Sequence, residues 1–148
     1  MSACTFFGHK DYCATDGNSK LKKILIDLIE KDRTDTFYVG NQGNFDIAVL
    51  KMLQELQNTY KHIRYFVVLA YHPTERDFAD FIQPENTLFP EELEKIHPKF
   101  AISKRNEWMI SKADYAVVFV RFITGGAAKY KTLSEKKGLK VFNIFDLT

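Results

Sequence analysis

The chain has 148 residues, which is enough for one domain with a buried core, and we predict a single domain over residues 1–148. Charged residues make up 27% of the chain and the net charge is +2, so the composition by itself does not indicate a polyanionic partner. The two cysteines have no second pair of ligands to complete a zinc site, no apolar stretch approaches the roughly 20 residues of a membrane helix, and the N-terminus lacks a secretion signal. We therefore expect a reduced, cytoplasmic protein without metal, cofactor or membrane partner.

Strand and helix patterns alternate along the first half of the chain. In order, the expected elements are a strand over 4–8, a helix over 19–31, a strand over 36–40, a helix over 45–60 and a strand over 64–71. The first helix has Asn18 or Ser19 as its expected N-cap. The strands are continuous apolar runs, which is typical of strands buried on both faces.

The second half begins with a segment that breaks this rhythm. Residues 72–98 contain several prolines and no long periodic pattern, and both a lid over a ligand and an irregular crossover remain open. After it, the expected elements are a helix over 100–114, a strand over 115–120, a helix over 130–138 and a strand over 140–144. The whole pattern predicts an α/β, Rossmann-like three-layer sandwich of about five mainly parallel strands with helices on both faces.

Ligands of such sheets bind at the carboxyl ends of the strands, so the loops after the strands are the expected place of function. Glycine and polar residues gather in three of these loops: Gly8, His9 and Lys10 after the first strand, Gly40, Asn41, Gly43 and Asn44 after the second, and Gly125 and Gly126 after the fourth. Each loop alone is also compatible with a turn or a helix cap. Together they predict a binding site.

The loop with the last glycine pair, RFITGGAAK (121–129), lies between a strand and a helix. The free N–H groups and the dipole at the start of that helix favour an anion such as phosphate.

Arg105 interrupts the apolar face of the helix over 100–114. A guanidinium keeps its charge when it is buried, so Arg105 needs a carboxylate, phosphate or carbonyl partner. A ligand phosphate and a protein carboxylate, Asp114 or Glu94, are both open as that partner.

Four segments in this order resemble a bacterial branch of the SLOG superfamily, which includes the Lonely-guy phosphoribohydrolases and the DNA-processing protein A group. They are CTFFGHKD (4–11), VGNQGNFD (39–46), FAISKRNEWMI (100–110) and TGGAAKYKTLSEKKG (124–138). Arg105 and Met109 match the R-x-x-x-M helix motif of the Lonely-guy enzymes, which lies beside a nucleoside monophosphate. The resemblance implies a Rossmann-like fold with a nucleotide-like ligand at the strand ends.

The leading hypothesis is therefore a domain that binds or senses a phosphorylated nucleotide derivative. The N–H groups after the glycine pair would hold phosphate, Arg105, His9 and Lys10 would add positive charge, and the loop over 40–44 would meet the sugar or base. The expected ligand-binding residues are Gly8, His9, Lys10, Gly40, Asn41, Gly43, Asn44, Arg105, Asn106, Met109, Gly125, Gly126, Ala127, Ala128 and Lys129.

The resemblance fails where the Lonely-guy loop motif, PGGxGTxxE, has its glutamate. Thr132 occupies that position, and Thr124, Ala128 and Lys129 also depart from the motif. Threonine cannot ionise, and cleavage of a base-to-sugar bond needs a carboxylate to activate water or stabilise charge. No catalytic residue is therefore expected, and the loop is predicted to bind without cutting.

Two alternatives remain open. A nucleoside monophosphate N-glycosidase or a deoxyribosyl-transfer enzyme would use Glu135, Glu107 or Asp46 in place of the missing glutamate. A single-stranded DNA-binding protein would need a continuous basic stripe with exposed aromatic rings, which the sequence does not favour. The identity of the base, the number of phosphates and homo-oligomer formation are left open by the sequence.

Overall fold

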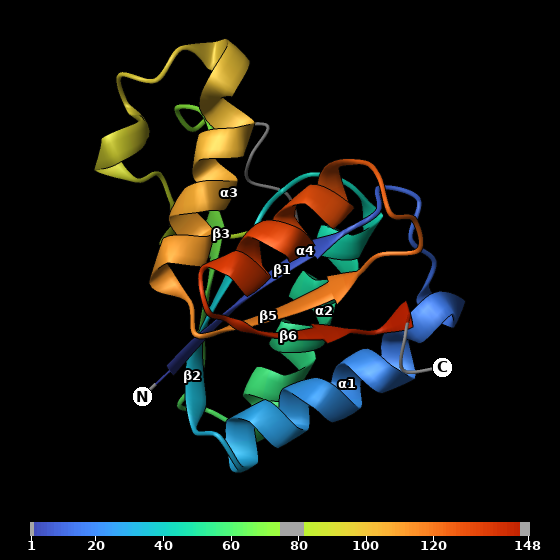
Figure 1. Ribbon diagram of the computed structural model, residues 1–148. Coiled ribbons are helices and arrows are strands. Elements are labelled where there is room, and N and C mark those ends of the chain that lie inside the picture. Colours follow the sequence, from blue (N-terminus) through green and yellow to red (C-terminus); the bar gives the residue numbers. More distant parts are fainter. Residues whose placement is uncertain (1, 75–81, 146–148) are drawn as a thin grey trace.

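The computed structural model describes residues 2–74 and 82–145, and within them it contains one six-stranded sheet (Figure 1). All strand pairs are parallel, in the order β4-β3-β2-β1-β5-β6. The strands are β1 (Ser2–Gly8), β2 (Thr34–Val39), β3 (Arg64–Val68), β4 (Thr87–Leu88), β5 (Tyr115–Phe119) and β6 (Lys140–Asn143). The predicted parallel α/β sheet is confirmed, with one more strand than the sequence indicated.

Helices cover both faces of the sheet. They are α1 (Ala14–Glu30), α2 (Asn44–Thr59), α3 (Ala101–Lys112) and α4 (Gly126–Lys136). Phe6 of β1 lies in an apolar cluster with α1 and α2, whereas its neighbour Phe7 lies in a second cluster with α3 and α4. Successive residues of a strand point to opposite faces, so the continuous apolar runs bury both faces and produce the predicted three layers.

The extra strand arises from the segment that broke the sequence pattern. This segment contains the short helices η2 (Pro84–Asn86), η3 (Glu91–Leu93) and η4 (Pro98–Phe100), and the two-residue β4 pairs with β3 at the edge of the sheet. A strand of two residues has no hydrophobic period that a sequence could reveal. The lid hypothesis for 72–98 falls partly on residues 75–81, which lie outside the described residues.

The predicted start of the first helix is wrong. The N-cap is Cys13, not Asn18 or Ser19, and the Cys13 N–H donates to the Asp16 carboxylate at 2.8 Å. The helix bends at Gly17, whose dihedral angles are non-helical, so the regular hydrophobic spacing begins only after the bend. The Asn18 side chain instead accepts a hydrogen bond from the Tyr12 hydroxyl at 2.7 Å.

The sheet order reverses between β1 and β5, which is where ligands bind in open α/β sheets. The carboxyl ends of β1, β2 and β5 therefore bring the loops that follow them to one edge, next to the start of α4. Among the described residues, no helix is long and apolar enough to cross a bilayer.

Gly8, the last residue of β1, lies directly against the second helix. A Cβ at this position would lie 2.3 Å from Cγ of Phe45, a fully buried ring at the start of α2. We predict that Gly8→Ala lowers the free energy of unfolding by about 1–3 kcal/mol, because the ring cannot move without disturbing the core. Urea denaturation measures this change.

Gly126→Ala is the matched control, because a Cβ at Gly126 meets no atom within 4 Å. It should leave the unfolding midpoint unchanged or raise it slightly. Equal midpoints for the two variants would contradict the close packing of Gly8 on Phe45.

Candidate functional site

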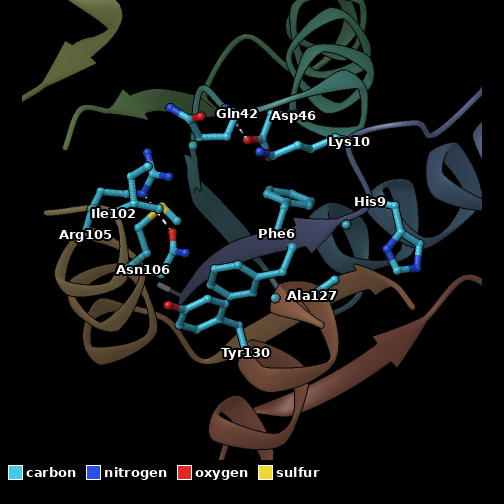
Figure 2. Close-up of a pocket in the computed structure, with 15 residues that line it drawn as sticks. Phe6, His9, Lys10, Gln42, Asp46, Ile102, Arg105, Asn106, Ala127 and Tyr130 are labelled. Carbon is cyan, nitrogen blue, oxygen red and sulfur yellow. Dashed lines mark hydrogen bonds between the residues drawn. The ribbon is translucent and has the colours of Figure 1, made fainter. Parts of the chain in front are cut away.

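A cavity of about 340 Å³ lies at the carboxyl ends of β1 and β2 and is walled by α3 and α4 (Figure 2). The predicted site residues that line it are Gly8, His9, Lys10, Gly40, Arg105, Asn106, Met109, Gly126 and Ala127. They come from four separate parts of the chain and meet only because the parallel strands end at the same edge. The glycine pair thus contributes Gly126, at the first turn of α4, to the same space as the buried Arg105.

Other predicted site residues lie outside this cavity and support its wall. The Asn44 N–H donates to the Lys10 carbonyl at 3.0 Å, and a Cβ at Gly43 would lie 2.7 Å from Lys10 Cα. Gly43 and Gly125 have φ angles of 91° and 105°, a region that favours glycine, and each is the N-cap of the helix that follows. These glycines and Asn44 therefore hold the loops in place and do not line the cavity.

The remaining predictions divide in a similar way. The Asn41 side chain accepts a hydrogen bond from Arg105 Nη1 at 3.2 Å, so it orients the guanidinium although it does not line the cavity itself. Ala128 lines a neighbouring cavity, together with Thr132. Lys129 is exposed, and its ammonium lies 5.4 Å from the centre of the Tyr130 ring.

Several lining residues were not among the predicted ligand-binding residues. They are Phe6, Phe7, Gln42, Asp46, Ile102 and Tyr130, and among these the sequence predicts a role only for Asp46, as a substitute catalytic carboxylate. Tyr130 lies one helical turn after Gly126, and Ile102 lies one turn before Arg105. Helical spacing from the two predicted site residues could therefore have predicted both positions. Phe6 and Phe7 carried no such signal, because they read as ordinary strand residues.

Arg105 is the central polar side chain of the site and is only 2% exposed. Its Nε donates to Asn106 Oδ1 at 2.8 Å, and its Nη1 donates to the Val68 carbonyl at 2.9 Å. The predicted carboxylate partners are wrong: Asp114 instead accepts from the Ala3 N–H at 3.0 Å, and Glu94 is exposed. Asn106 on the same helix accepts from Nε, and groups distant in the sequence, the Val68 carbonyl and the Asn41 side chain, accept from Nη1.

A buried carboxylate lies close to this guanidinium. A Cβ at Gly40 would lie 3.1 Å both from Arg105 Cζ and from Asp46 Oδ2, so the missing side chain leaves room for the two groups. Burial raises the pKa of Asp46 to about 6, and the Gln42 N–H at 2.8 Å and the charge of Arg105 oppose that rise. Burial likewise lowers the pKa of Arg105, and Asp46 opposes this change.

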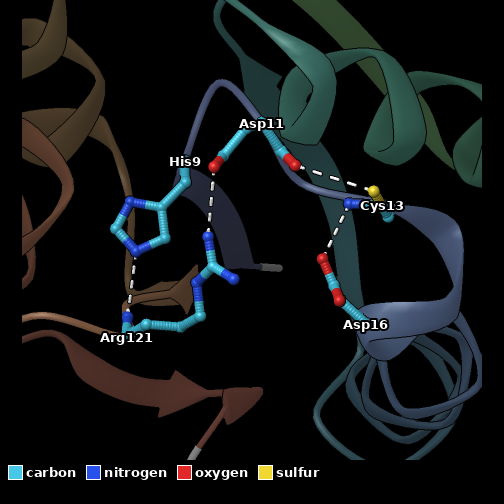
Figure 3. A network of polar contacts seen from close by, with 5 residues as sticks. All are labelled: His9, Asp11, Cys13, Asp16 and Arg121. Carbon is cyan, nitrogen blue, oxygen red and sulfur yellow. Dashed lines mark hydrogen bonds and ion pairs between the residues drawn. The ribbon is translucent and has the colours of Figure 1, made fainter.

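His9 joins the loop after β1 to the loop after β5 (Figure 3). Its Nε2 accepts a hydrogen bond from the Arg121 N–H at 2.9 Å, so the ring is neutral and carries its proton on Nδ1. Burial lowers the pKa of His9, the charge of Arg121 lowers it further, and Asp11 opposes both. Asp11 also accepts from Arg121 Nη2 at 3.2 Å, which fixes the start of the loop with the glycine pair.

The carboxylates considered for catalysis are not equally placed. Asp46 lines the cavity, whereas Glu107 pairs with Lys104 at 3.6 Å and Glu135 with Lys131 at 3.5 Å outside it. Over the described ranges 2–74 and 82–145, no group of three His, Cys, Asp or Glu side chains could hold a metal ion.

Neither the protein-family models nor the curated proteins give a match to this chain. The chain does resemble the X-ray structure of DNA processing protein A (DprA) from Streptococcus pneumoniae, with a TM-score of 0.65 and 15% identity. The similarity covers 97% of this chain and 50% of that one, so the chain spans about half the length of its structural neighbour. At this identity the match shows the Rossmann-like fold, and membership of the bacterial SLOG branch stays a prediction.

The raised pKa of Asp46 gives a pH dependence with a definite sign. The ordinary pKa is 3.8 and the folded value is about 6, so the folded state binds this proton more tightly than the unfolded chain between these values. The free energy of unfolding should therefore fall as the pH rises from about 4 to about 6, by at most about 3 kcal/mol. Urea denaturation at several pH values measures this slope.

Asp46→Asn should remove this contribution, because an amide does not titrate. The stability of the wild type relative to the variant should therefore decrease over the same pH range. A difference between the two proteins that stays constant with pH would contradict a raised pKa at Asp46.

Proposed function

We propose that the cavity binds a phosphorylated, nucleotide-like ligand and that the protein acts as a ligand-binding or sensing domain without hydrolase activity. The observation that carries the proposal is a cavity that brings the buried Arg105 guanidinium together with the N-terminus of α4 at the carboxyl ends of parallel strands. Ligand sites of α/β proteins have this position, and a volume of about 340 Å³ lies within the usual range for small molecules.

The phosphate would lie at the α4 end of the cavity. Gly126 and Ala127 line the cavity in the first turn of this helix, where the N–H groups have no partner within the helix. Lys10 adds a positive charge, and the neutral His9 keeps a proton on Nδ1 as a donor. These groups are of different kinds, and all of them favour an anion.

The rest of the ligand would extend toward α3. Phe6, Met109 and Ile102 give this part of the cavity apolar surface, and the polar groups of Arg105 and Asn106 lie among them. An apolar wall with few, well-placed polar groups is typical of sites for planar organic groups such as nucleobases. A cavity with a phosphate site at one end and apolar and polar side chains at the other supports a nucleotide over a bare sugar phosphate.

Binding assays with AMP, ADP-ribose, NAD and cyclic dinucleotides test the proposal. We expect at least one of them to bind, and Lys10→Ala to weaken that binding about tenfold or more by removing a charge-assisted contact. Lys23→Ala is the control, since Lys23 is exposed on α1 and does not line the cavity. Arg105→Met should weaken binding further, with circular dichroism to check that this variant folds. Failure of all these compounds, and of IMP, to bind would contradict the proposal.

Hydrolysis of a nucleoside monophosphate is the second candidate. Asp46 favours it, because a carboxyl group that lines the cavity with a pKa of about 6 has the properties of a general acid or base. The leading proposal predicts that no free base is released from AMP or dAMP at high protein concentration, as chromatography would measure. Release of base that Asp46→Asn abolishes would replace it with the second candidate.

Binding of single-stranded DNA is a further candidate, because the structural neighbour is described as a DNA processing protein. Such binding needs a basic stripe with exposed aromatic rings. Lys131 is already paired with Glu135, and the ring of Tyr130 is buried, so the described part of α4 offers little of this surface. A salt-dependent mobility shift with an oligonucleotide would favour this candidate over the leading one.

A further inference from the structure

Three polar atoms on the α3 and α4 side of the cavity have no hydrogen-bond partner among the residues that the structure describes. They are Nη2 of Arg105, Nδ2 of Asn106 and the hydroxyl oxygen of Tyr130. All three side chains are at least nine-tenths buried, with exposed fractions of 2%, 8% and 8%. The donors and acceptors of such largely buried side chains are normally satisfied within the protein, so three unpaired ones on residues that line one cavity are available to a ligand.

These atoms are accessible from the cavity. Among the residues that the structure describes, the unpaired side-chain atom that is itself fully buried is Nε of Arg121, in a different cavity. The three unpaired atoms of Arg105, Asn106 and Tyr130 therefore keep some exposed surface. Arg105, Asn106 and Tyr130 all line the cavity of the candidate site, where Figure 2 shows their side chains on the same side. Their free atoms can therefore reach a bound molecule.

The chemistry of the two α3 atoms is fixed by the bonds their side chains already make. Asn106 must present its oxygen to Arg105 Nε, at 2.8 Å, because Nε can only donate. The amide nitrogen Nδ2 is therefore the free end of Asn106, and it is a donor. The remaining guanidinium nitrogen, Nη2, is also a donor, so α3 offers two neighbouring donors to the ligand. The Tyr130 hydroxyl can donate or accept, so it does not by itself distinguish one base from another.

The charge of this wall favours an uncharged acceptor over a second phosphate. The Asp46 carboxylate lies near Arg105 across the gap at Gly40 and offsets the guanidinium charge. A phosphate at this end would lie close to that carboxylate, which would repel it. The α4 end of the cavity already provides for the phosphate.

We propose, on the basis of the proposed function, that the donors of Arg105 and Asn106 select a 6-oxopurine nucleotide over a 6-aminopurine nucleotide. A 6-oxopurine presents two neighbouring acceptors, O6 and N7, and both can accept from this wall. Adenine presents N7 beside an amino group, so one protein donor would face another donor and lose its partner. Discrimination by a paired hydrogen-bond site of this kind is larger than by shape alone.

IMP and AMP test this proposal directly, because they differ only at C6 and N1 of the base. Isothermal titration calorimetry should give a dissociation constant for IMP about tenfold or more below that for AMP. 7-Deaza-IMP, which lacks the N7 acceptor, should bind about tenfold more weakly than IMP. Equal affinities for IMP and AMP would overturn the inference and leave the proposed function intact.

Asn106→Asp gives the sharpest variant. The new carboxylate can still accept from Arg105 Nε, but its second oxygen is an acceptor where Nδ2 was a donor, so the preference should shift toward AMP by about tenfold or more. Asn41→Asp is the matched control: Asn41 also accepts from Arg105, yet it does not line the cavity. It places the same charge near the guanidinium and should keep the preference for IMP.

The remaining outcomes separate the two proposals. Loss of the IMP preference in both variants would assign it to the charge near Arg105 and overturn the role of Nδ2. Binding of ribose 5-phosphate as tightly as IMP would mean that the base is not read and would overturn the inference. If neither IMP nor AMP binds at millimolar concentration, the inference fails, and the proposed function remains to be decided by the other nucleotides.

Discussion

The burial of one guanidinium governs the structure around the carboxyl ends of the strands. Arg105 cannot lose its charge, so the chain must supply acceptors and a nearby anion inside the protein. The Val68 carbonyl comes from the end of β3, Asn41 comes from the loop after β2, and Asp46 comes from the first turn of α2. The absence of a side chain at Gly40 is part of the same solution, because a Cβ there would crowd both charged groups. One positive charge therefore explains an otherwise unrelated set of residues.

The loops around the cavity are fixed to one another as well as to the sheet. The α2 N-terminus holds the backbone of Lys10 through the Asn44 N–H, and His9 holds the backbone of Arg121 in the loop after β5. The Arg121–Asp11 ion pair adds a second link between the same two loops. All of these contacts join groups of the protein itself, so the loops need no contact with a ligand to be held in place, and binding would cost little ordering.

The sequence predicted the fold well because the signal was repeated along the chain. Continuous apolar strands require cover on both faces, and each additional strand–helix alternation narrowed the choice to a parallel α/β sheet. The failures were local: the bend at Gly17 hid the true start of α1 at Cys13, and the two-residue β4 had no period to detect. The need of Arg105 for a partner was predictable from its chemistry. The identity of that partner was not, because it depends on which strand ends meet in space.

The structure also bears on the position that the resemblance to the Lonely-guy loop motif aligns with its glutamate. Thr132 stands at the position of that glutamate in the sequence, but it lines the neighbouring cavity together with Ala128, not the cavity of Arg105. The one carboxylate of the three considered that lines the cavity of Arg105 is Asp46, and its Oδ2 already accepts the Gln42 N–H while its charge offsets that of Arg105. A group held in this way is suited to orienting a guanidinium and a ligand, and it could take up catalysis only by giving up part of that role. The contacts of this buried pair therefore favour the proposed binding role over the proposed hydrolysis.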